Sequence, residues 1–382
     1  MKKKVAFFVP SLNVGGVERV LVTYANLFSR RGYDVSVFNL TSGDTIITNG
    51  FDKEIHYYEK YIPIPHFFHA KIRDILKLNF RFRSFGSWIN YHSSKYLAKK
   101  YIKDKFDIVI AFFGITTLKI VGGIVDECTK KIGWIHGGGK IDNYYPIKKY
   151  KNAVKIISSM DKIVCVSEGT RMAVERTYGV SENIFVINNP VDSNFIRKLS
   201  MESDIPQKKR FTFVNASRFD DRQKGFSRLL KVCKRLNDEG YEYDFWLIGD
   251  GIDFDKIKNL ACNYKLDNIF FFGKQSNPYK FIKNADMYVC SSYSEGFSIV
   301  MIETVILATP ILTTDVPGAI EMLDGGKYGM IVQNSEDGLY NGMKKILASK
   351  ELQGYYKKMA DLRKDYLSEE KIMNQVEEII NN

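Results

Sequence analysis

The sequence predicts an α/β protein with two Rossmann-like, doubly wound domains that face each other across a cleft. A length of 382 residues suits two domains, each large enough to bury its own core. In both halves, short apolar runs rich in β-branched residues alternate with helix-like stretches, a pattern typical of parallel sheets covered by helices. A polar stretch at residues 193–209 separates the two halves.

The first half contains a series of buried-strand patterns with helices between them. Helices are expected at Val17–Arg31 and Glu168–Tyr178, because a glycine follows each one and glycine commonly ends a helix. The expected strands are Val5–Val9, Asp34–Leu40, Asp107–Phe112, Lys131–His136, Lys162–Ser167 and Ile184–Asn188.

The second half repeats this plan, and charged amphipathic helices follow from Tyr355 onward. The expected strands are Phe211–Ala216, Phe245–Ile248, Ile269–Phe272, Met287–Cys290 and Pro310–Thr313, and the helices are Gly225–Asn237, Asp253–Tyr264, Phe297–Ala308 and Gly338–Ser349. We therefore expect an N-terminal domain at 1–192, a linker at 193–209, a C-terminal domain at 210–364 and a terminal helix at 365–382.

The composition excludes several classes of protein. The five cysteines include no C-x-x-C pair, which argues against a disulfide scaffold and a cysteine-ligated zinc site and favours a reducing cytosol. The lysine-rich start resembles a signal peptide, but its apolar run stops at Pro10. No apolar stretch reaches the ~20 residues that span a bilayer. We expect a soluble protein without export signals.

Most of the net charge of +12 lies in one segment, Lys60–Lys105, which has eleven Lys or Arg against two Asp. Aromatic and aliphatic residues are interleaved with these charges. Basic and apolar residues together favour binding to an anionic membrane surface. A solvated helical face over ordinary core residues explains the segment equally well. Nucleic-acid binding is not expected, because no nucleic-acid motif accompanies the charge.

The first candidate site is the loop at residues 11–19, which carries Gly15 and Gly16 between the first strand and the first helix. Paired glycines let a ligand approach the backbone, and a helix N-terminus favours an anion. The spacing matches neither a dinucleotide fingerprint nor a P-loop. A tight turn without a ligand is the alternative.

The second candidate site opens the other half. Arg218 follows its first strand, and Lys224 is expected at the start of the next helix. Two fixed cations beside a helix N-terminus suit a diphosphate, because they neutralise charge both in the bound group and in the departing one. The aspartates between them fit a solvated turn as well.

The third candidate site pairs Glu295, in a loop, with Glu303, expected about two turns into an apolar helix. A carboxylate in apolar surroundings needs partners, and ligand hydroxyls such as those of ribose or a sugar can supply them. Local capping or pairing of Glu303 is the alternative.

The fourth feature is His136, which is expected at the end of a strand. It precedes three glycines at the expected edge of the cleft. A structural histidine remains the alternative. By contrast, His66 and His69 are expected on the surface. Asp253 and Asp255 imitate the D-x-D of metal-dependent sugar transferases, but acids are common at a helix start, so no metal site is expected.

Together these features resemble the family 4 glycosyltransferases, from Gly15 and Gly16 through Arg218 and Lys224 to the E-x7-E of Glu295 and Glu303. The resemblance implies the GT-B fold, with the C-terminal helix crossing back to the N-terminal domain. It implies that Arg218 and Lys224 hold the donor diphosphate and that Glu303 holds the ribose. Glu295 and backbone N–H groups near Phe297, Ser298 and Ile299 would contact the donor sugar, Gly16 the diphosphate, His136 the transferred sugar and Lys274 the base.

The resemblance also implies a mechanism. A hexose or N-acetylhexosamine would pass from a nucleotide sugar to an acceptor with retention of configuration, by front-face attack. Neither metal nor cofactor would be needed, and closure of the two domains would complete the site. UDP is the favoured nucleotide, and GDP stays open.

The expected acceptor is a lipid-linked saccharide at the inner face of a bacterial membrane, in capsule, lipopolysaccharide or teichoic-acid assembly. Two alternatives share the fold. One is a nucleotide-sugar 2-epimerase, and the other is a catalytically silent, membrane-associated partner in a polysaccharide-assembly complex. The four intact motifs favour an enzyme.

Overall fold

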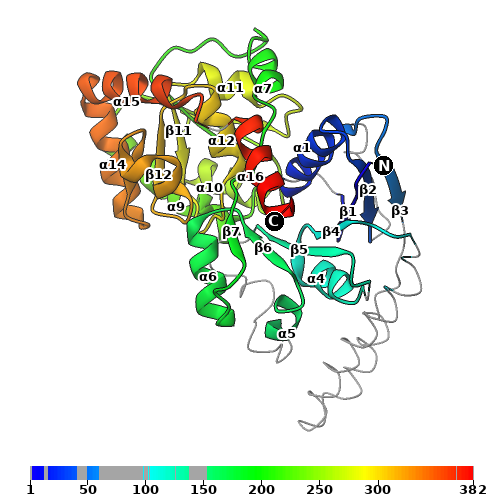
Figure 1. Ribbon diagram of the computed structural model, residues 1–382. Coiled ribbons are helices and arrows are strands. Elements are labelled where there is room, and N and C mark those ends of the chain that lie inside the picture. Colours follow the sequence, from blue (N-terminus) through cyan, green and yellow to red (C-terminus); the bar gives the residue numbers. More distant parts are fainter. Residues whose placement is uncertain are drawn as a thin grey trace. The chain divides into compact units, whose positions relative to one another are not determined.

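The computed structural model describes residues 2–12, 16–40, 50–59, 98, 102, 104–124, 126–136, 153–366 and 368–381 (Figure 1). Contacts divide the chain into two compact units. The N-terminal unit comprises Met1–Pro190 with Ile372–Asn382, and the C-terminal unit comprises Val191–Lys371. Each unit has its own parallel sheet, so the predicted fold class of two Rossmann-like domains is confirmed.

Within its described residues, the N-terminal unit has a seven-stranded parallel sheet in the order β3-β2-β1-β4-β5-β6-β7. The strands are β1 (Lys4–Val9), β2 (Asp34–Asn39), β3 (His56–Glu59), β4 (Ile108–Ala111), β5 (Lys130–Ile135), β6 (Lys162–Cys165) and β7 (Ile184–Val186). The helices are α1 (Gly16–Arg30), α4 (Gly114–Gly122), α5 (Ala153–Ile157) and α6 (Glu168–Tyr178).

The last helix, α16 (Glu369–Asn381), belongs mainly to the N-terminal unit although it ends the chain. Glu377 forms a salt bridge of 2.9 Å with Arg31 of that unit, and Asn381 accepts a hydrogen bond of 2.9 Å from Lys3. The helix buries Ile372, Met373, Val376, Ile379 and Ile380. Burial of this apolar stripe fixes the helix to the N-terminal unit.

The C-terminal unit has a six-stranded parallel sheet in the order β10-β9-β8-β11-β12-β13. The strands are β8 (Thr212–Ala216), β9 (Asp244–Ile248), β10 (Ile269–Gly273), β11 (Met287–Cys290), β12 (Ile311–Thr314) and β13 (Met330–Val332). The helices are α7 (Ser193–Leu199), α8 (Asp221–Lys224), α9 (Phe226–Asp238), α10 (Phe254–Asn263), α11 (Tyr279–Asn284), α12 (Ile299–Ile306), α13 (Ala319–Met322), α14 (Glu336–Ala348) and α15 (Lys350–Arg363), with a 3-10 turn at Asp324–Gly326.

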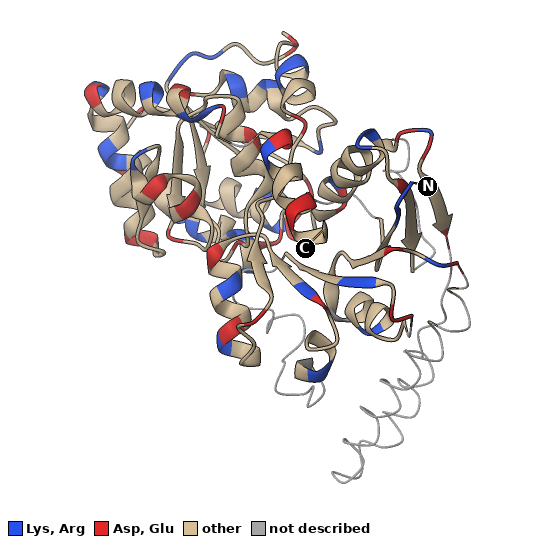
Figure 2. Cartoon of the chain, viewed as in Figure 1, with Lys and Arg blue, Asp and Glu red and all other residues tan. Residues whose placement is uncertain are grey.

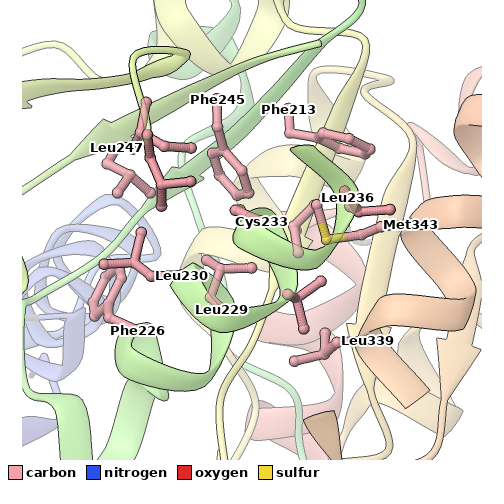
Figure 3. Close-up of a cluster of buried hydrophobic side chains, with 14 of the residues drawn as sticks. Phe213, Phe226, Leu229, Leu230, Cys233, Leu236, Phe245, Leu247, Leu339 and Met343 are labelled. Carbon is pink, nitrogen blue, oxygen red and sulfur yellow. The ribbon is translucent and has the colours of Figure 1, made fainter. Parts of the chain in front are cut away.

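The core of the C-terminal unit forms where α9 and α14 cover one face of the sheet (Figure 3). Helix α9 contributes the apolar face of an amphipathic helix, and Phe213, Phe245 and Leu247 of the strands pack against it. Leu339 and Met343 of α14 complete the layer. This packing fixes the start of α9, and with it the loop that carries Arg218 and Lys224.

Several local features differ from the sequence-based expectation, among them the short helices α4, α5, α11 and α13, which were not predicted. Strands β3 and β13 were not predicted, because each is only a few residues long and half-exposed. The predicted linker begins with α7, which packs against α11 and α12. The predicted helix at Gly225–Asn237 begins one residue later, because Gly225 adopts a left-handed φ of 68° between α8 and α9.

The basic segment Lys60–Lys105 lies almost entirely outside the described residues, so its predicted contact with a membrane stays a prediction. In the parts of the chain that are described, no helix combines the length and apolar character needed to cross a bilayer. Charged residues of these parts lie mainly on helices and loops, while the strands are mostly uncharged (Figure 2).

Candidate functional site

Three predicted loops follow strands β8, β10 and β11 at the carboxyl edge of the C-terminal sheet. Parallel strands bring their carboxyl ends to one edge, and open sheets of this class bind ligands there. Arg218 and Lys224 follow β8, Lys274 follows β10, and Glu295 and Glu303 follow β11. The sheet topology therefore gathers five of the predicted residues at one edge.

Arg218 is an exposed cation of this edge. Its guanidinium donates one long hydrogen bond of 3.4 Å to the side chain of Gln223, and within the described residues it forms no salt bridge. Asp220 follows two residues later in the chain. Its side chain is 7% exposed, and its Oδ1 has no hydrogen-bond partner within the described residues. The exposed guanidinium is therefore accessible to a ligand, and its predicted role at a diphosphate stays a prediction.

Lys224 lies at the end of α8, not at the start of the following helix as predicted. Its Nζ donates a hydrogen bond of 2.6 Å to Oε1 of Glu295, although 71 residues separate the two in sequence. Both side chains are largely buried, at 16% and 8% exposure. One of three ammonium protons is used in this bond, so the others can reach phosphate oxygens.

Ser292 also contacts Glu295, and the sequence analysis did not predict this residue. Its hydroxyl donates a hydrogen bond of 2.5 Å to the same Oε1 of Glu295. Within the described residues, no hydrogen bond reaches the second carboxylate oxygen of Glu295. That oxygen remains able to accept hydrogen bonds from hydroxyl groups of a ligand. The sequence did contain a signal for Ser292: it and Ser291 directly follow the strand β11, and polar residues at this end of a parallel strand lie at the edge where such sheets bind ligands.

Glu303 lies in α12, but only about one turn from its start, because the helix begins at Ile299 rather than at Phe297. Its side chain is 2% exposed, and its Oε1 accepts a hydrogen bond of 3.0 Å from the Tyr279 hydroxyl of α11. Tyr279 is a second residue that the sequence analysis missed. The hydrogen bond thus links this carboxylate to the start of α11.

The start of α12 carries the predicted backbone contacts. Ser298 is the N-cap residue, but in the structure its side chain makes no capping hydrogen bond. The N–H groups of the first turn therefore remain free of a side-chain cap, in a setting that favours an anion or a polar ligand. Phe297 is buried, whereas Ser298 and Ile299 are half-exposed. Lys274 is exposed one residue beyond β10.

The N-terminal unit holds the remaining predicted residues. His136 follows β5 and is 9% exposed, with its ring 4.6 Å from that of Phe112. Neither ring nitrogen has a hydrogen bond of normal geometry in the described part of the chain. Burial lowers the pKa of His136 to about 3, against a weaker opposing effect of the Phe112 backbone. The imidazole is therefore neutral at pH 7.

Gly16 begins α1 and is exposed, whereas Gly15 lies outside the described residues. The structure thus brings Lys224 and Glu295 into direct contact and places Arg218, Lys274 and Glu303 on the same sheet edge. The roles predicted for His136, Gly15 and Gly16 at the donor stay predictions.

The D-x-D aspartates, Asp253 and Asp255, lie at the start of helix α10. Asp253 is the N-cap residue of α10, but its carboxylate accepts a hydrogen bond of 2.8 Å from the backbone N–H of Asp221 in α8 and makes no capping hydrogen bond to α10 itself. No group of three or more His, Cys, Asp or Glu suited to a metal ion occurs in the described part of the chain. An open hollow of about 500 Å³ lies near the amino ends of β1, β2 and β3, at the amino edge of the N-terminal sheet.

Comparison with known families decides the class of protein. Residues 14–195 match the family described as "Glycosyltransferase Family 4", and residues 197–363 match "Glycosyl transferases group 1". The two matches follow each other along the chain. The chain is a family 4 glycosyltransferase.

Relatives of this glycosyltransferase include two bacterial proteins matched over almost the whole chain. An uncharacterized glycosyltransferase of Haemophilus influenzae is 23% identical over 367 residues, which are 94% of each chain. The second relative is from Campylobacter jejuni and is also 23% identical, with 94% of each chain covered. It is named N-acetylgalactosamine-N,N'-diacetylbacillosaminyl-diphospho-undecaprenol 4-alpha-N-acetylgalactosaminyltransferase.

Solved structures share the fold. A variant of S. aureus TarM, in complex with fondaparinux, alpha-GlcNAc-glycerol and UDP, has a TM-score of 0.75 at 15% identity, with both chains covered completely. Anabaena Alr3699/HepE in complex with UDP and glucose has a TM-score of 0.72 at 16% identity, again over both whole chains. This glycosyltransferase therefore has the GT-B fold that the resemblance implied.

Proposed function

We propose that this glycosyltransferase moves a hexose or N-acetylhexosamine from a nucleoside-diphosphate sugar, with UDP as the favoured nucleotide, to a lipid-linked saccharide. The single observation that carries the donor proposal is the contact between Lys224 and Glu295 beside the exposed Arg218. Cations suit the diphosphate, and a carboxylate with a free oxygen suits sugar hydroxyls. The UDP in complexes of two structural neighbours supports the nucleotide.

We propose a retaining, metal-independent mechanism. The bond between the anomeric carbon and the phosphate oxygen breaks, and the acceptor oxygen attacks that carbon from the same face. The departing phosphate oxygen takes the proton of the acceptor hydroxyl, so a nucleoside diphosphate leaves. Arg218 and Lys224 stabilise the charge that develops on it, which is the role a metal ion serves in other transferases.

The proposed acceptor rests on the relatives. The name of the Campylobacter jejuni relative specifies a diphospho-undecaprenol acceptor and an alpha linkage. Another relative, from Staphylococcus aureus, is named for capsular polysaccharide biosynthesis and is 30% identical over 120 residues, 30% of this chain and 31% of its own. An acceptor of this kind places the reaction at a membrane, where the basic segment Lys60–Lys105 would contact anionic lipids.

A transfer assay tests this proposal. Radiolabelled UDP-linked and GDP-linked sugars are offered with polyprenyl-diphosphate-linked saccharides in buffer containing EDTA, and the anomeric configuration of the product is read by NMR. We expect transfer from one UDP-linked sugar, retention of configuration and no loss with EDTA. An inverted product would contradict the mechanism. Nucleotide binding without transfer to any acceptor would favour the silent-partner alternative, and release of a 2-epimer would favour the epimerase.

Glu303→Gln tests the ribose assignment through the measured affinity for the nucleotide. The amide keeps the shape of the side chain but weakens hydrogen bonds from the ribose hydroxyls, so we expect nucleotide affinity to fall at least tenfold. The matched control is Glu242→Gln, on the exposed surface of the same unit. Unchanged affinity in Glu303→Gln would remove the ribose assignment.

Membrane contact is tested separately. We expect the chain to cosediment with vesicles that contain anionic phosphatidylglycerol and to remain in solution with pure phosphatidylcholine vesicles, with binding that weakens as salt rises. Equal binding to both kinds of vesicle, or to neither, would contradict a role for the basic segment in membrane contact.

A further inference from the structure

Arg228 of α9 is a buried cation for which the site described above has no use. Its side chain is 5% exposed, although arginine is rarely buried unless it is paired. Within the described residues it forms no salt bridge with a carboxylate. Its hydrogen bonds go to backbone carbonyls, and burial lowers the pKa of its guanidinium. Burial of a guanidinium without a carboxylate partner costs free energy, which the hydrogen bonds to these carbonyls offset in part.

The carbonyls that Arg228 binds belong to the loop that carries Glu295. Nε donates to the carbonyl of Ser291 at 3.1 Å, and Nη2 donates to the carbonyls of Ser291 and Ser292 at 2.6 and 2.9 Å. The guanidinium also lies 3.8 Å from the ring centroid of Tyr293. One side chain thus contacts three consecutive residues of the loop after β11.

The same loop is joined to the segment that carries Lys224. The Ser291 hydroxyl donates to the carbonyl of Lys224 at 2.8 Å, and the backbone N–H of Tyr293 donates to the carbonyl of Gln223 at 2.8 Å. Arg228 follows Lys224 by four residues. It therefore binds the loop from α9, the helix that begins two residues after the lysine.

Ser292 connects this contact to the reacting groups. Its carbonyl accepts from Arg228, and its hydroxyl donates to the carboxylate of Glu295 at 2.5 Å. That carboxylate in turn binds Lys224. We propose that Arg228 is a positioning residue that fixes the Ser291–Glu295 loop and so holds Glu295 and Lys224 in the geometry needed at the donor sugar and its diphosphate. This inference rests on the proposed function.

Arg228→Lys is the decisive variant. A lysine keeps the positive charge, but its single ammonium cannot reproduce the fork that reaches two carbonyls and faces an aromatic ring. The matched control is Arg235→Lys. Arg235 lies on the same helix, and its guanidinium also lies 3.8 Å from a ring centroid, that of Tyr340, but its side chain is 41% exposed and pairs with Asp337.

Four readouts separate positioning from general stability: the thermal midpoint, hydrogen exchange over residues 291–298, steady-state kinetics with a UDP-linked sugar, and the affinity for UMP. For Arg228→Lys we expect faster exchange in that segment and a kcat at least tenfold lower. Its KM for the donor and its affinity for UMP should stay within about threefold, because the ribose contact at Glu303 is retained. Arg235→Lys should match the wild type in all of these.

Each other outcome has a defined meaning. If Arg228→Lys keeps its kcat and the exchange rate of residues 291–298, Arg228 does not position the loop. If kcat, UMP affinity and the thermal midpoint all fall together, its role is only structural, and the proposal is wrong. Failure of the proposed function would be seen differently, because the wild-type chain itself would bind neither UMP nor UDP.

Discussion

Glu295 receives two short hydrogen bonds on a single oxygen, from Lys224 at 2.6 Å and from Ser292 at 2.5 Å. These bonds fix the carboxylate before any ligand arrives, which lowers the cost of orienting it in the reaction. The lysine is fixed in the same way. The pair is thus preorganised, and its disruption should affect the chemical step more than the binding of nucleotide.

Glu295→Gln tests this preorganisation. The amide is neutral, so the salt bridge to Lys224 is lost while the size of the side chain is kept. We expect kcat to fall by about 10²–10³, the usual effect of removing one preorganised polar group, with a smaller change in UDP affinity. The measurement is steady-state kinetics with the UDP-linked sugar. A variant with wild-type kcat would exclude Glu295 from the reaction.

His136 should make the N-terminal unit sensitive to acid. Burial lowers its pKa to about 3, whereas an unfolded histidine titrates near 6.5. Between these values the unfolded chain binds a proton that the folded chain does not, so stability falls as pH falls. From pH 7 to pH 5 we expect a loss of up to about 2 kcal/mol.

Urea unfolding of the wild type and of His136→Gln at both pH values measures this loss. We expect the variant to lose less stability on acidification than the wild type does. Equal pH dependence in the two proteins would show that His136 is not buried as a neutral group.

At the scale of elements, the turn between α8 and α9 depends on Gly225. Its φ of 68° lies in the left-handed region, and a Cβ there would lie 2.4 Å from the carbonyl oxygen of Ser291. Both facts point to glycine at this position. The turn ends α8 at Lys224 and brings the lysine beside the loop of Glu295.

Gly225→Ala should therefore lower both stability and turnover. The control is Gly240→Ala, at a φ of 81° with no heavy atom within 4 Å of the added Cβ. We expect the control to lose only about 1–2 kcal/mol, the cost of a left-handed alanine, and to keep its kcat. Gly225→Ala should lose more stability and most of its kcat. Chemical denaturation and kinetics measure both, and equal effects in the two variants would contradict this view of the turn.

Most elements were predictable from sequence because β-branched runs and glycine helix ends are local signals. Strands β1 and β8 are examples, because each lies within a run that the sequence analysis assigned to a strand, to within one residue. Strand β3 and helix α7 were missed, because tertiary contacts rather than local pattern stabilise such short elements. In the site, the residue types and their strand ends were predictable. The contact between Lys224 and Glu295 was not predictable, because the two residues are 71 positions apart in the sequence. The role of Arg228 was not predictable either, because its sequence pattern is that of any helix residue.

At the scale of the whole molecule, the chain forms two units with separate cores, and its last helix returns to the first unit. Met373 of α16 is fully buried there. Met373→Ala should destabilise the N-terminal unit by about 2–5 kcal/mol, the usual effect of truncating a buried methionine. The exposed Glu370 gives the control, since Glu370→Ala should change stability by less than about 0.5 kcal/mol.

Hydrogen exchange shows which unit responds. Exchange in β1 and β4 should become faster in Met373→Ala, while β8 and β11 should stay as protected as in the wild type, because the cores are separate. Faster exchange in the C-terminal unit alone would contradict the assignment of α16 to the N-terminal unit.

Titration calorimetry with UDP in buffer containing EDTA tests most directly whether the edge that carries Arg218 and Lys224 holds a nucleoside diphosphate. We expect the wild type to bind UDP without metal and Arg218→Ala to bind it at least tenfold more weakly, with an unchanged thermal midpoint for this exposed residue. No binding of UDP, GDP or ADP by the wild type, or equal UDP affinity in Arg218→Ala, would contradict the account.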